Sequence, residues 1–393
     1  MKITQTQIST ILICFLMNML DGMDVMVVSY AAPTISKNWA ISPQALGVVF
    51  SAGLLGMAIG AMFLGNYADK IGRKNIIMLC CGLMGMSVFA TSWASSVEAL
   101  IFFRIISGVG IGGMLASTAT LVAEYSPQGN KEFWVSFGMS GYPIGAVLSG
   151  LVASKIIPLY GWQTMFQVAG VATFITLPVV YFFLKESSDF LQTSEIKKNP
   201  SVTALLTPVY KKATLFLWLA IFMAFSTLYF LTLWTPKLAS SMGLSTQLAI
   251  YAGTVFNVGA FFGIISQGYL SGKFGLEKVV FSYFILTALL MFAFGYFKGS
   301  DAVLWVFGLL GFGIQGGFIG IYALAAKLYP TEIRATGVGW AIGAGRVGAI
   351  VGPALAGLLI GAGVSVTTNF VIFAIPTIIA GLVMLTLKNI SND

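Results

Sequence analysis

Long apolar runs separated by short polar segments dominate this chain. A helix needs about 20 apolar residues to cross the hydrocarbon core of a bilayer, and the runs are of that length. The pattern predicts helices at residues 8–32, 43–66, 75–94, 97–123, 133–157, 163–184, 213–236, 246–271, 278–297, 302–326, 336–361 and 366–387. We therefore expect an all-α membrane protein with twelve transmembrane helices.

The composition excludes a soluble domain. Of the 393 residues, 58% are hydrophobic and only 9% are charged, and the mean hydropathy is +0.91. The three cysteines, Cys14, Cys80 and Cys81, lie inside apolar runs without the spacing of metal ligands or of a disulfide framework. No nucleophile–base constellation is visible either, so we expect no enzyme activity, no metal and no cofactor. Histidine is absent, and a proton relay would therefore use carboxylates or tyrosines.

Basic residues are distributed unevenly between alternate loops, and this asymmetry predicts the orientation. One set of loops carries most of the Lys and Arg residues, including Lys70, Arg73 and Lys74, whereas the other set holds only Lys37, Lys155, Lys237 and Lys298. Cytoplasmic loops are the basic ones in membrane proteins. The uneven distribution of the formal charge of +8 thus predicts that both termini lie in the cytoplasm, and it argues against nucleic-acid binding because the charges lie in short loops.

The longest polar interval divides the chain into two halves. It predicts an N-terminal six-helix bundle over 1–184, a cytoplasmic linker over 185–212 and a C-terminal six-helix bundle over 213–393. An internal repeat supports the division. The motif from Gly65 to Lys74 recurs, in weaker form, from Gly268 to Lys278, and Ala123-Glu124-Tyr125-Ser126-Pro127 aligns at the same offset with Ala326-Lys327-Leu328-Tyr329-Pro330.

Two carboxylates, Asp21 and Asp24, stand in the middle of the first apolar run. Charged side chains at membrane depth are costly and mark functional paths, and a spacing of three places both on roughly one helix face. Two like charges this close favour protonation of one member. The pair is therefore a candidate proton carrier. The alternative is a locally unwound helix in which the aspartates bind free backbone N–H groups near Gly22.

Two arginines, Arg104 and Arg346, also lie deep in apolar runs. Arginine keeps its proton, and its planar fork matches a carboxylate with two hydrogen bonds. One arginine per half suggests a substrate carboxylate held near the membrane midplane. For Arg104, an ion pair with Asp21 or Asp24 is the competing interpretation.

Polar and aromatic residues inside the predicted helices complete a candidate substrate site. Buried amides need hydrogen-bond partners, so Asn257 and Gln315 favour a water-filled path. Aromatic residues are weaker indicators, because they make up 13% of the chain and many must be core or interface residues. The aromatic candidates are Tyr30, Tyr142, Trp234, Tyr322 and Trp340.

The segment from Gly65 to Lys74 predicts a tight loop that acts as a cytoplasmic gate. Gly65 and Gly72 would permit the turn, Asp69 would cap a helix end, and Arg73 would bind a carboxylate. Glu124, at the end of the fourth predicted helix, is the partner that we expect for Arg73. The alternative is a basic loop that only fixes the topology.

These motifs resemble a known superfamily over the whole chain. Gly65-Asn66-Tyr67-Ala68-Asp69-Lys70-Ile71-Gly72-Arg73-Lys74 resembles the loop signature of the major facilitator superfamily, and Arg104 followed by Gly108, Gly110 and Gly112 is similar to its fourth-helix pattern. Within that superfamily, Leu20-Asp21-Gly22-Met23-Asp24 resembles the first-helix motif of the aromatic acid:proton symporters. So does the stretch from Tyr329 to Gly339 followed by Gly345-Arg346-Val347-Gly348 and Gly352-Pro353.

The resemblance implies a major facilitator fold and the import of a small aromatic carboxylate, such as a benzoate, hydroxybenzoate or phenylpropionate, by alternating access. It assigns proton coupling to Asp21 and Asp24, substrate binding to Arg346, and gating to Arg73 with Glu124. We expect a monomer in the lipid bilayer whose partners are a small organic anion and the coupling proton. Symport of another organic anion or an amino acid (nicotinate, sialate), proton-driven export and a non-transporting membrane sensor are the alternatives.

Overall fold

The structure, a computed structural model, describes residues 4–127, 131–187, 202–297 and 302–390. Within these ranges all regular secondary structure is helical, and no strand occurs. Eleven of the described helices are long and apolar enough to cross a membrane. The chain is therefore a multi-pass membrane protein, as its apolar runs predict.

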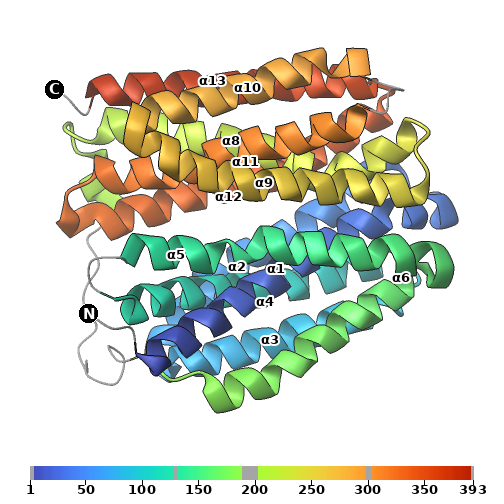
Figure 1. The fold of residues 1–393 in the computed structure, drawn as a ribbon, viewed down its shortest axis with the longest axis horizontal. Coiled ribbons are helices and arrows are strands. Elements are labelled where there is room, and N and C mark those ends of the chain that lie inside the picture. Colours follow the sequence, from blue (N-terminus) through green and yellow to red (C-terminus); the bar gives the residue numbers. More distant parts are fainter. Residues whose placement is uncertain (1–3, 128–130, 188–201, 298–301, 391–393) are drawn as a thin grey trace. The chain divides into compact units, whose positions relative to one another are not determined.

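The contacts divide the chain into two compact units, 1–41 with 48–196 and 42–47 with 197–393. The boundary after Ile196 lies inside the predicted linker 185–212. The helices between the N-terminus and the boundary, blue to green in Figure 1, are α1 (Gln5–Trp39), α2 (Pro43–Ile71), α3 (Arg73–Thr91), α4 (Val97–Tyr125), α5 (Lys131–Met139) and α6 (Gly141–Phe183). Those after it, yellow to red, are η1 (Val202–Leu206), α8 (Lys211–Ser241), α9 (Thr246–Phe274), α10 (Leu276–Phe297), α11 (Val303–Leu328), α12 (Thr331–Gly361) and α13 (Val366–Ile390).

One long helix accounts for the difference between twelve predicted spans and eleven described helices. Helix α6 is bent at Gly161, which has φ 86° and ψ 166°, a backbone conformation that favours glycine. In Figure 1 the ribbon of α6 reverses its direction, and its second arm slants away from the first. The two arms of α6 thus correspond to most of the predicted span 133–157 and to the predicted span 163–184.

The predicted span 133–157 is itself interrupted at Ser140. Helix α5 ends at Met139 and α6 begins at Gly141, and the Ser140 amide donates to the Phe137 carbonyl in a tight turn, at 3.1 Å. Pro143 explains the break, because a proline has no N–H to donate and its ring clashes with the carbonyl four residues earlier, that of Met139. The apolar pattern does not register this interruption, since Ser140 lies within a run that is mainly apolar on both sides.

Glycines bring helix backbones into close contact, and they do so in the same way in both units. A Cβ on Gly56 or Gly60 of α2 would collide with a backbone carbonyl of α4. Gly259 and Gly263 of α9 make the equivalent contacts with α11, at a constant sequence offset. Small residues allow such close helix packing in membranes. The internal repeat is therefore present in the packing, not only in the motifs.

The same offset relates α1 and α6 to α8 and α12. Gly145 of α6 lies against the carbonyl of Met19, and Gly348 of α12 lies against the carbonyl of Phe222. Each helix of the first pair can thus be aligned residue by residue with its counterpart in the second. This alignment shows where the two units carry different chemistry.

Replacing Gly145 with alanine is expected to destabilise the protein, because the added methyl group would meet the backbone of α1 and not a movable side chain. Overpacking of this kind costs about 1–3 kcal/mol. Gly82 is the matched control, since a Cβ there would meet nothing within 4 Å and alanine is the better helix former by about 1 kcal/mol. Thermal unfolding in detergent should show a lower midpoint for Gly145→Ala and an unchanged or higher one for Gly82→Ala. Equal midpoints would contradict the packing.

Candidate functional site

A buried ion pair joins α1 to α4 in the first unit. The Arg104 guanidinium donates to both carboxylate oxygens of Asp24, at 2.6 Å and 3.3 Å. The side chains are only 3% and 1% exposed. A paired guanidinium and carboxylate satisfy each other with two parallel hydrogen bonds. Arg104 thus forms the ion pair with Asp24 that was the competing interpretation of this arginine.

Asp21 lies one helical turn before Asp24 and is also buried, at 3% exposure. Helix α1 is continuous from Gln5 to Trp39, so the alternative of a locally unwound helix at the aspartates is wrong. Gly22 lets α1 lie close to α6, because a Cβ there would collide with the Tyr142 carbonyl. The two acids therefore stay on a rigid helix beside the arginine.

The Arg104 guanidinium is also enclosed by α2. A Cβ on Gly53 would lie 3.6 Å from its Nε atom and 3.7 Å from one terminal nitrogen. Three helices of one unit therefore surround a cluster of two carboxyl groups and one arginine. One arginine can neutralise one of two carboxylates, and a proton can neutralise the other.

Arg346 lies in α12 of the second unit, in a different environment. Its guanidinium carbon is 5.9 Å from the ring centre of Phe225 on α8, a distance at which a cation interacts with an aromatic face. Its charge also acts on the Tyr322 hydroxyl of α11. Arg346 and Tyr322, both half-buried, are thus brought together with an aromatic ring that the sequence did not single out.

The remaining polar candidates are mostly structural in their contacts. The Tyr30 hydroxyl donates to the Ala146 carbonyl at 2.9 Å, and the Trp234 indole donates to the Pro353 carbonyl at 3.1 Å. Both side chains have no exposed surface. The expectation that they face a cavity is therefore wrong, because each instead fastens a pair of helices.

Three other candidates differ in exposure. Trp340 is 48% exposed and stacks on Trp218 with ring centres 6.1 Å apart. Gln315 is 7% exposed and Asn257 is fully buried. The Asn257 amide donates to the Gly253 carbonyl in its own helix, at 2.9 Å, and its oxygen has no hydrogen-bond partner among the described residues.

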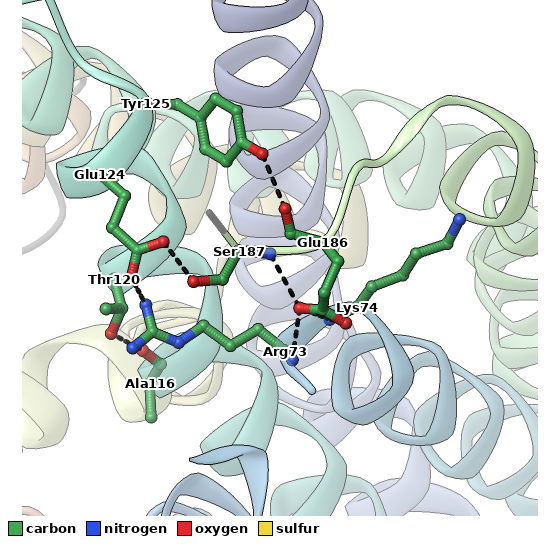
Figure 2. A network of polar contacts seen from close by, with 8 residues as sticks. All are labelled: Arg73, Lys74, Ala116, Thr120, Glu124, Tyr125, Glu186 and Ser187. Atoms are coloured by element: carbon green, nitrogen blue, oxygen red, sulfur yellow. Dashed lines mark hydrogen bonds and ion pairs between the residues drawn. The ribbon is translucent and has the colours of Figure 1, made fainter. Parts of the chain in front are cut away.

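The structure brings Arg73 and Glu124 together, as an ion pair between the start of α3 and the end of α4 (Figure 2). The other Glu124 oxygen accepts a hydrogen bond from the Ser187 hydroxyl, at 2.6 Å. Ser187 lies just beyond α6. The ends of three helices of the first unit are thus tied together at one carboxylate.

Glu186 is a central member of this network that the sequence analysis missed. Its carboxylate accepts the backbone N–H groups of Arg73, at 2.8 Å, and of Lys74, at 3.2 Å, as Figure 2 shows. Its carbonyl accepts from the Tyr125 hydroxyl at 2.7 Å. A carboxylate at a helix N-terminus satisfies free N–H groups and interacts well with the helix dipole.

A sequence signal for Glu186 did exist. The residue that precedes α3 is Gly72, which has no side chain with which to cap the helix. The free N–H groups of the first turn therefore need an acceptor from elsewhere. An acid directly after the predicted span 163–184 is a reasonable source.

The predicted loop from Gly65 to Lys74 is wrong in its extent. Helix α2 continues to Ile71 and α3 begins at Arg73, so Gly72 alone forms the connection. Its φ of 95° makes so short a turn possible. Gly65 is a helix-packing residue instead, since a Cβ there would lie 3.2 Å from that of Ala116. The side chain of Asp69, the predicted helix cap, lies outside the described residues.

The second unit repeats the turn but not the ion pair. Gly275, the counterpart of Gly72, separates α9 from α10 with φ 90°. Leu276 and Lys327 stand where the first unit has Arg73 and Glu124. The charged network is therefore a property of the first unit, and the glycine turn belongs to both.

Replacing Glu186 with alanine is expected to lower the free energy of unfolding by about 1 kcal/mol, the usual cost of removing a helix cap, because two N–H groups of α3 lose their acceptor. Lys185→Ala is the control, since Lys185 is exposed and such substitutions usually change stability by less than about 0.5 kcal/mol. Thermal unfolding of the purified protein checks this. The capping role is refuted if Glu186→Ala and Lys185→Ala unfold at the same temperature.

Comparison with known proteins places this arrangement in a family. The sequence model of the Major Facilitator Superfamily matches residues 14–268 and 252–391. The 3-(3-hydroxy-phenyl)propionate transporter of Escherichia coli is 34% identical over 97% of this chain and 94% of its own length. The 4-hydroxybenzoate transporter of Pseudomonas putida is 31% identical over 92% and 88%. The benzoate transport protein of Acinetobacter baylyi is 31% identical over 99% and 91%.

A solved structure supports the fold independently. The D-xylose-proton symporter superposes with a TM-score of 0.78 over 96% of this chain and 97% of its own, at 18% sequence identity. At that identity the likeness concerns the fold alone. With the family match and these relatives, the chain belongs to the Major Facilitator Superfamily of membrane transporters.

Proposed function

We propose that this protein is a proton-coupled symporter that imports a small aromatic carboxylate across the bacterial inner membrane by alternating access. The observation that carries the coupling is the buried Asp24–Arg104 ion pair with Asp21 one turn away. The substrate class follows from relatives named for 4-hydroxybenzoate, benzoate and 3-(3-hydroxyphenyl)propionate. The coupling ion is the proton, for which the acid pair supplies acceptors.

The charges of the acid cluster favour the binding of a proton. Arg104 neutralises Asp24 through two hydrogen bonds, and a charged Asp21 adds a second negative charge at membrane depth. Burial and a neighbouring like charge both favour the protonated form of a carboxyl group. Asp21 takes up the proton in this scheme, because protonating Asp24 would break the ion pair and leave Arg104 buried without its partner.

Arg346 gives the anion a place to bind. A carboxylate matches its guanidinium fork, and the neighbouring Phe225 ring offers an apolar face to an aromatic substrate. Binding of both proton and anion favours whichever state of the transporter holds both most tightly, because a ligand shifts a conformational equilibrium only by its difference in affinity. Substrate and proton then move together.

The charged network around Glu124 is proposed to serve the cytoplasmic gate. The loop at Gly72 and the residues Arg73 and Glu124 lie on the side that carries most basic loop residues, and basic loops face the cytoplasm. Both termini belong to that side as well. In this proposal the ion pair and the Glu186 cap fasten the helix ends of the first unit while that face is closed.

The experiment is uptake of labelled 4-hydroxybenzoate into liposomes that contain the purified protein. An imposed gradient, acid outside, should drive accumulation that collapses when a protonophore removes the gradient. Accumulation driven by the opposite gradient would indicate export. Accumulation that ignores the gradient would refute proton coupling, and absence of any flux of aromatic acids would refute the substrate class.

A further inference from the structure

Four aromatic rings from α8 and α11 form a continuous series that lies beside Arg346. Phe225 stacks on Tyr229, with ring centres 5.8 Å apart, and meets Phe318 edge-on at 4.7 Å. Phe318 in turn meets Tyr322 edge-on at 5.0 Å. With the guanidinium carbon of Arg346 5.9 Å from the Phe225 ring centre, the chain of rings lies beside a fixed positive charge.

The phenylalanines of this series are more buried than its tyrosines and Arg346. Phe225 and Phe318 are buried, at 1% and 8%. Tyr229, Tyr322 and Arg346 are half-buried, and both Arg346 and Tyr229 lie near enough to Tyr322 to interact with it electrostatically. Two half-buried tyrosines and a guanidinium group therefore adjoin two buried phenylalanine rings.

A second aromatic cluster in the same unit shows what plain core packing looks like. Phe294 stacks on Phe370 with ring centres 3.9 Å apart, and Phe230 stacks on Phe373 at 4.0 Å. All four side chains are at most 1% exposed, and among the described residues no cation lies over these rings. The cluster near Arg346 differs because a guanidinium lies over one of its rings, that of Phe225, and because its two tyrosines are only half-buried.

The internal repeat shows that the Arg346 cluster is special to the second unit. At the constant offset, Phe225 and Tyr229 align with Gly22 and Met26 of α1, and Arg346 aligns with Pro143. Asp21 and Asp24 in turn align with Ala224 and Thr227 of α8. The first unit thus carries the acids, and the second carries the rings and Arg346.

We propose that Phe225, Tyr229, Phe318 and Tyr322 form the substrate-selecting wall of the Arg346 site, where Tyr229 and Tyr322 donate to the carboxylate beside Arg346 and Phe225 and Phe318 select a planar aromatic ring. This inference rests on the proposed function and adds the residues that set its specificity. Aromatic pairs prefer offset or edge-to-face geometry and gain from it beyond the area that they bury. A saturated ring of similar size cannot make those contacts.

The test compares binding of benzoate and cyclohexanecarboxylate to purified protein by calorimetry. The wild type should prefer benzoate by about tenfold, in line with the usual strength of aromatic pairing. Phe318→Leu and Phe225→Leu should bring the two affinities within about twofold, whereas Phe318→Tyr should keep the preference. The control Phe230→Leu removes a buried ring from the plain core cluster and should also keep it.

The tyrosines should behave differently from the phenylalanines. Tyr322→Phe and Tyr229→Phe should weaken binding of both acids by a similar factor, about 10–150-fold for a lost hydrogen bond to a charged group. The ratio of the two affinities should stay unchanged. The leucine variants could keep the wild-type ratio of benzoate to cyclohexanecarboxylate affinity while the wild type transports aromatic acids. In that case the four aromatic residues do not select the substrate, and the proposed function stands. If the wild type binds no aromatic acid, both are overturned.

Discussion

Replacing Asp21 with asparagine is expected to abolish accumulation of 4-hydroxybenzoate against its gradient while exchange of internal for external substrate persists. The amide has nearly the shape of the acid but cannot take up a proton, so the substrate can still bind and cross without coupling. The Asp24–Arg104 ion pair stays in place in this variant. Accumulation and exchange are measured in the same liposomes.

Asp24→Asn is expected to lose accumulation as well, and to lose stability in addition. It leaves the buried Arg104 charge without its partner, and breaking a buried ion pair on one side costs about 3–5 kcal/mol. Glu98→Gln is the control for both variants, because Glu98 is an exposed acid in the first turn of α4. Uptake that still follows an imposed pH gradient in Asp21→Asn and Asp24→Asn would show that the acid pair does not couple transport.

Replacing Arg346 with glutamine is expected to weaken substrate binding by about 30–4,000-fold, the range for losing one partner of a hydrogen-bonded charge pair. Arg346→Lys keeps the positive charge but loses the planar guanidinium that forms paired hydrogen bonds. Its dissociation constant should therefore lie between those of the wild type and Arg346→Gln. Calorimetric titration with 4-hydroxybenzoate measures the dissociation constants.

Arg334→Gln is the matched control, since Arg334 lies on the same helix but is exposed and donates to the Tyr329 carbonyl, at 3.3 Å. It should bind like the wild type. A wild-type dissociation constant for Arg346→Gln would move the carboxylate site away from α12. The acid cluster of the first unit would not be affected by that result.

The helices and their order follow from the apolar pattern, because a membrane span has to be both long and apolar. The pattern failed where backbone chemistry decides. Pro143 ends α5 within an apolar run, and Gly72 makes a turn of one residue where a longer loop was predicted. In each case a single residue changes the path of the chain without changing its hydropathy.

The charged residues of the site could be named from the sequence, but their pairing could not. Burial singles out Asp21, Asp24 and Arg104, yet only the packing of α1 against α4 decides which aspartate receives the arginine. Glu186 was missed because its partners are backbone N–H groups far away in the sequence. Phe225 could not be told from the other phenylalanines, since only the directions of the side chains bring it beside Arg346.

Direct observation of the co-transported proton tests the central claim most sharply. Liposomes with the purified protein are placed in an unbuffered medium at equal internal and external pH, and 4-hydroxybenzoate is added outside. The account predicts that the medium becomes more alkaline as substrate enters through the wild-type protein, and that this change is lost in Asp21→Asn although labelled substrate still exchanges. The same alkaline shift in Asp21→Asn would contradict it.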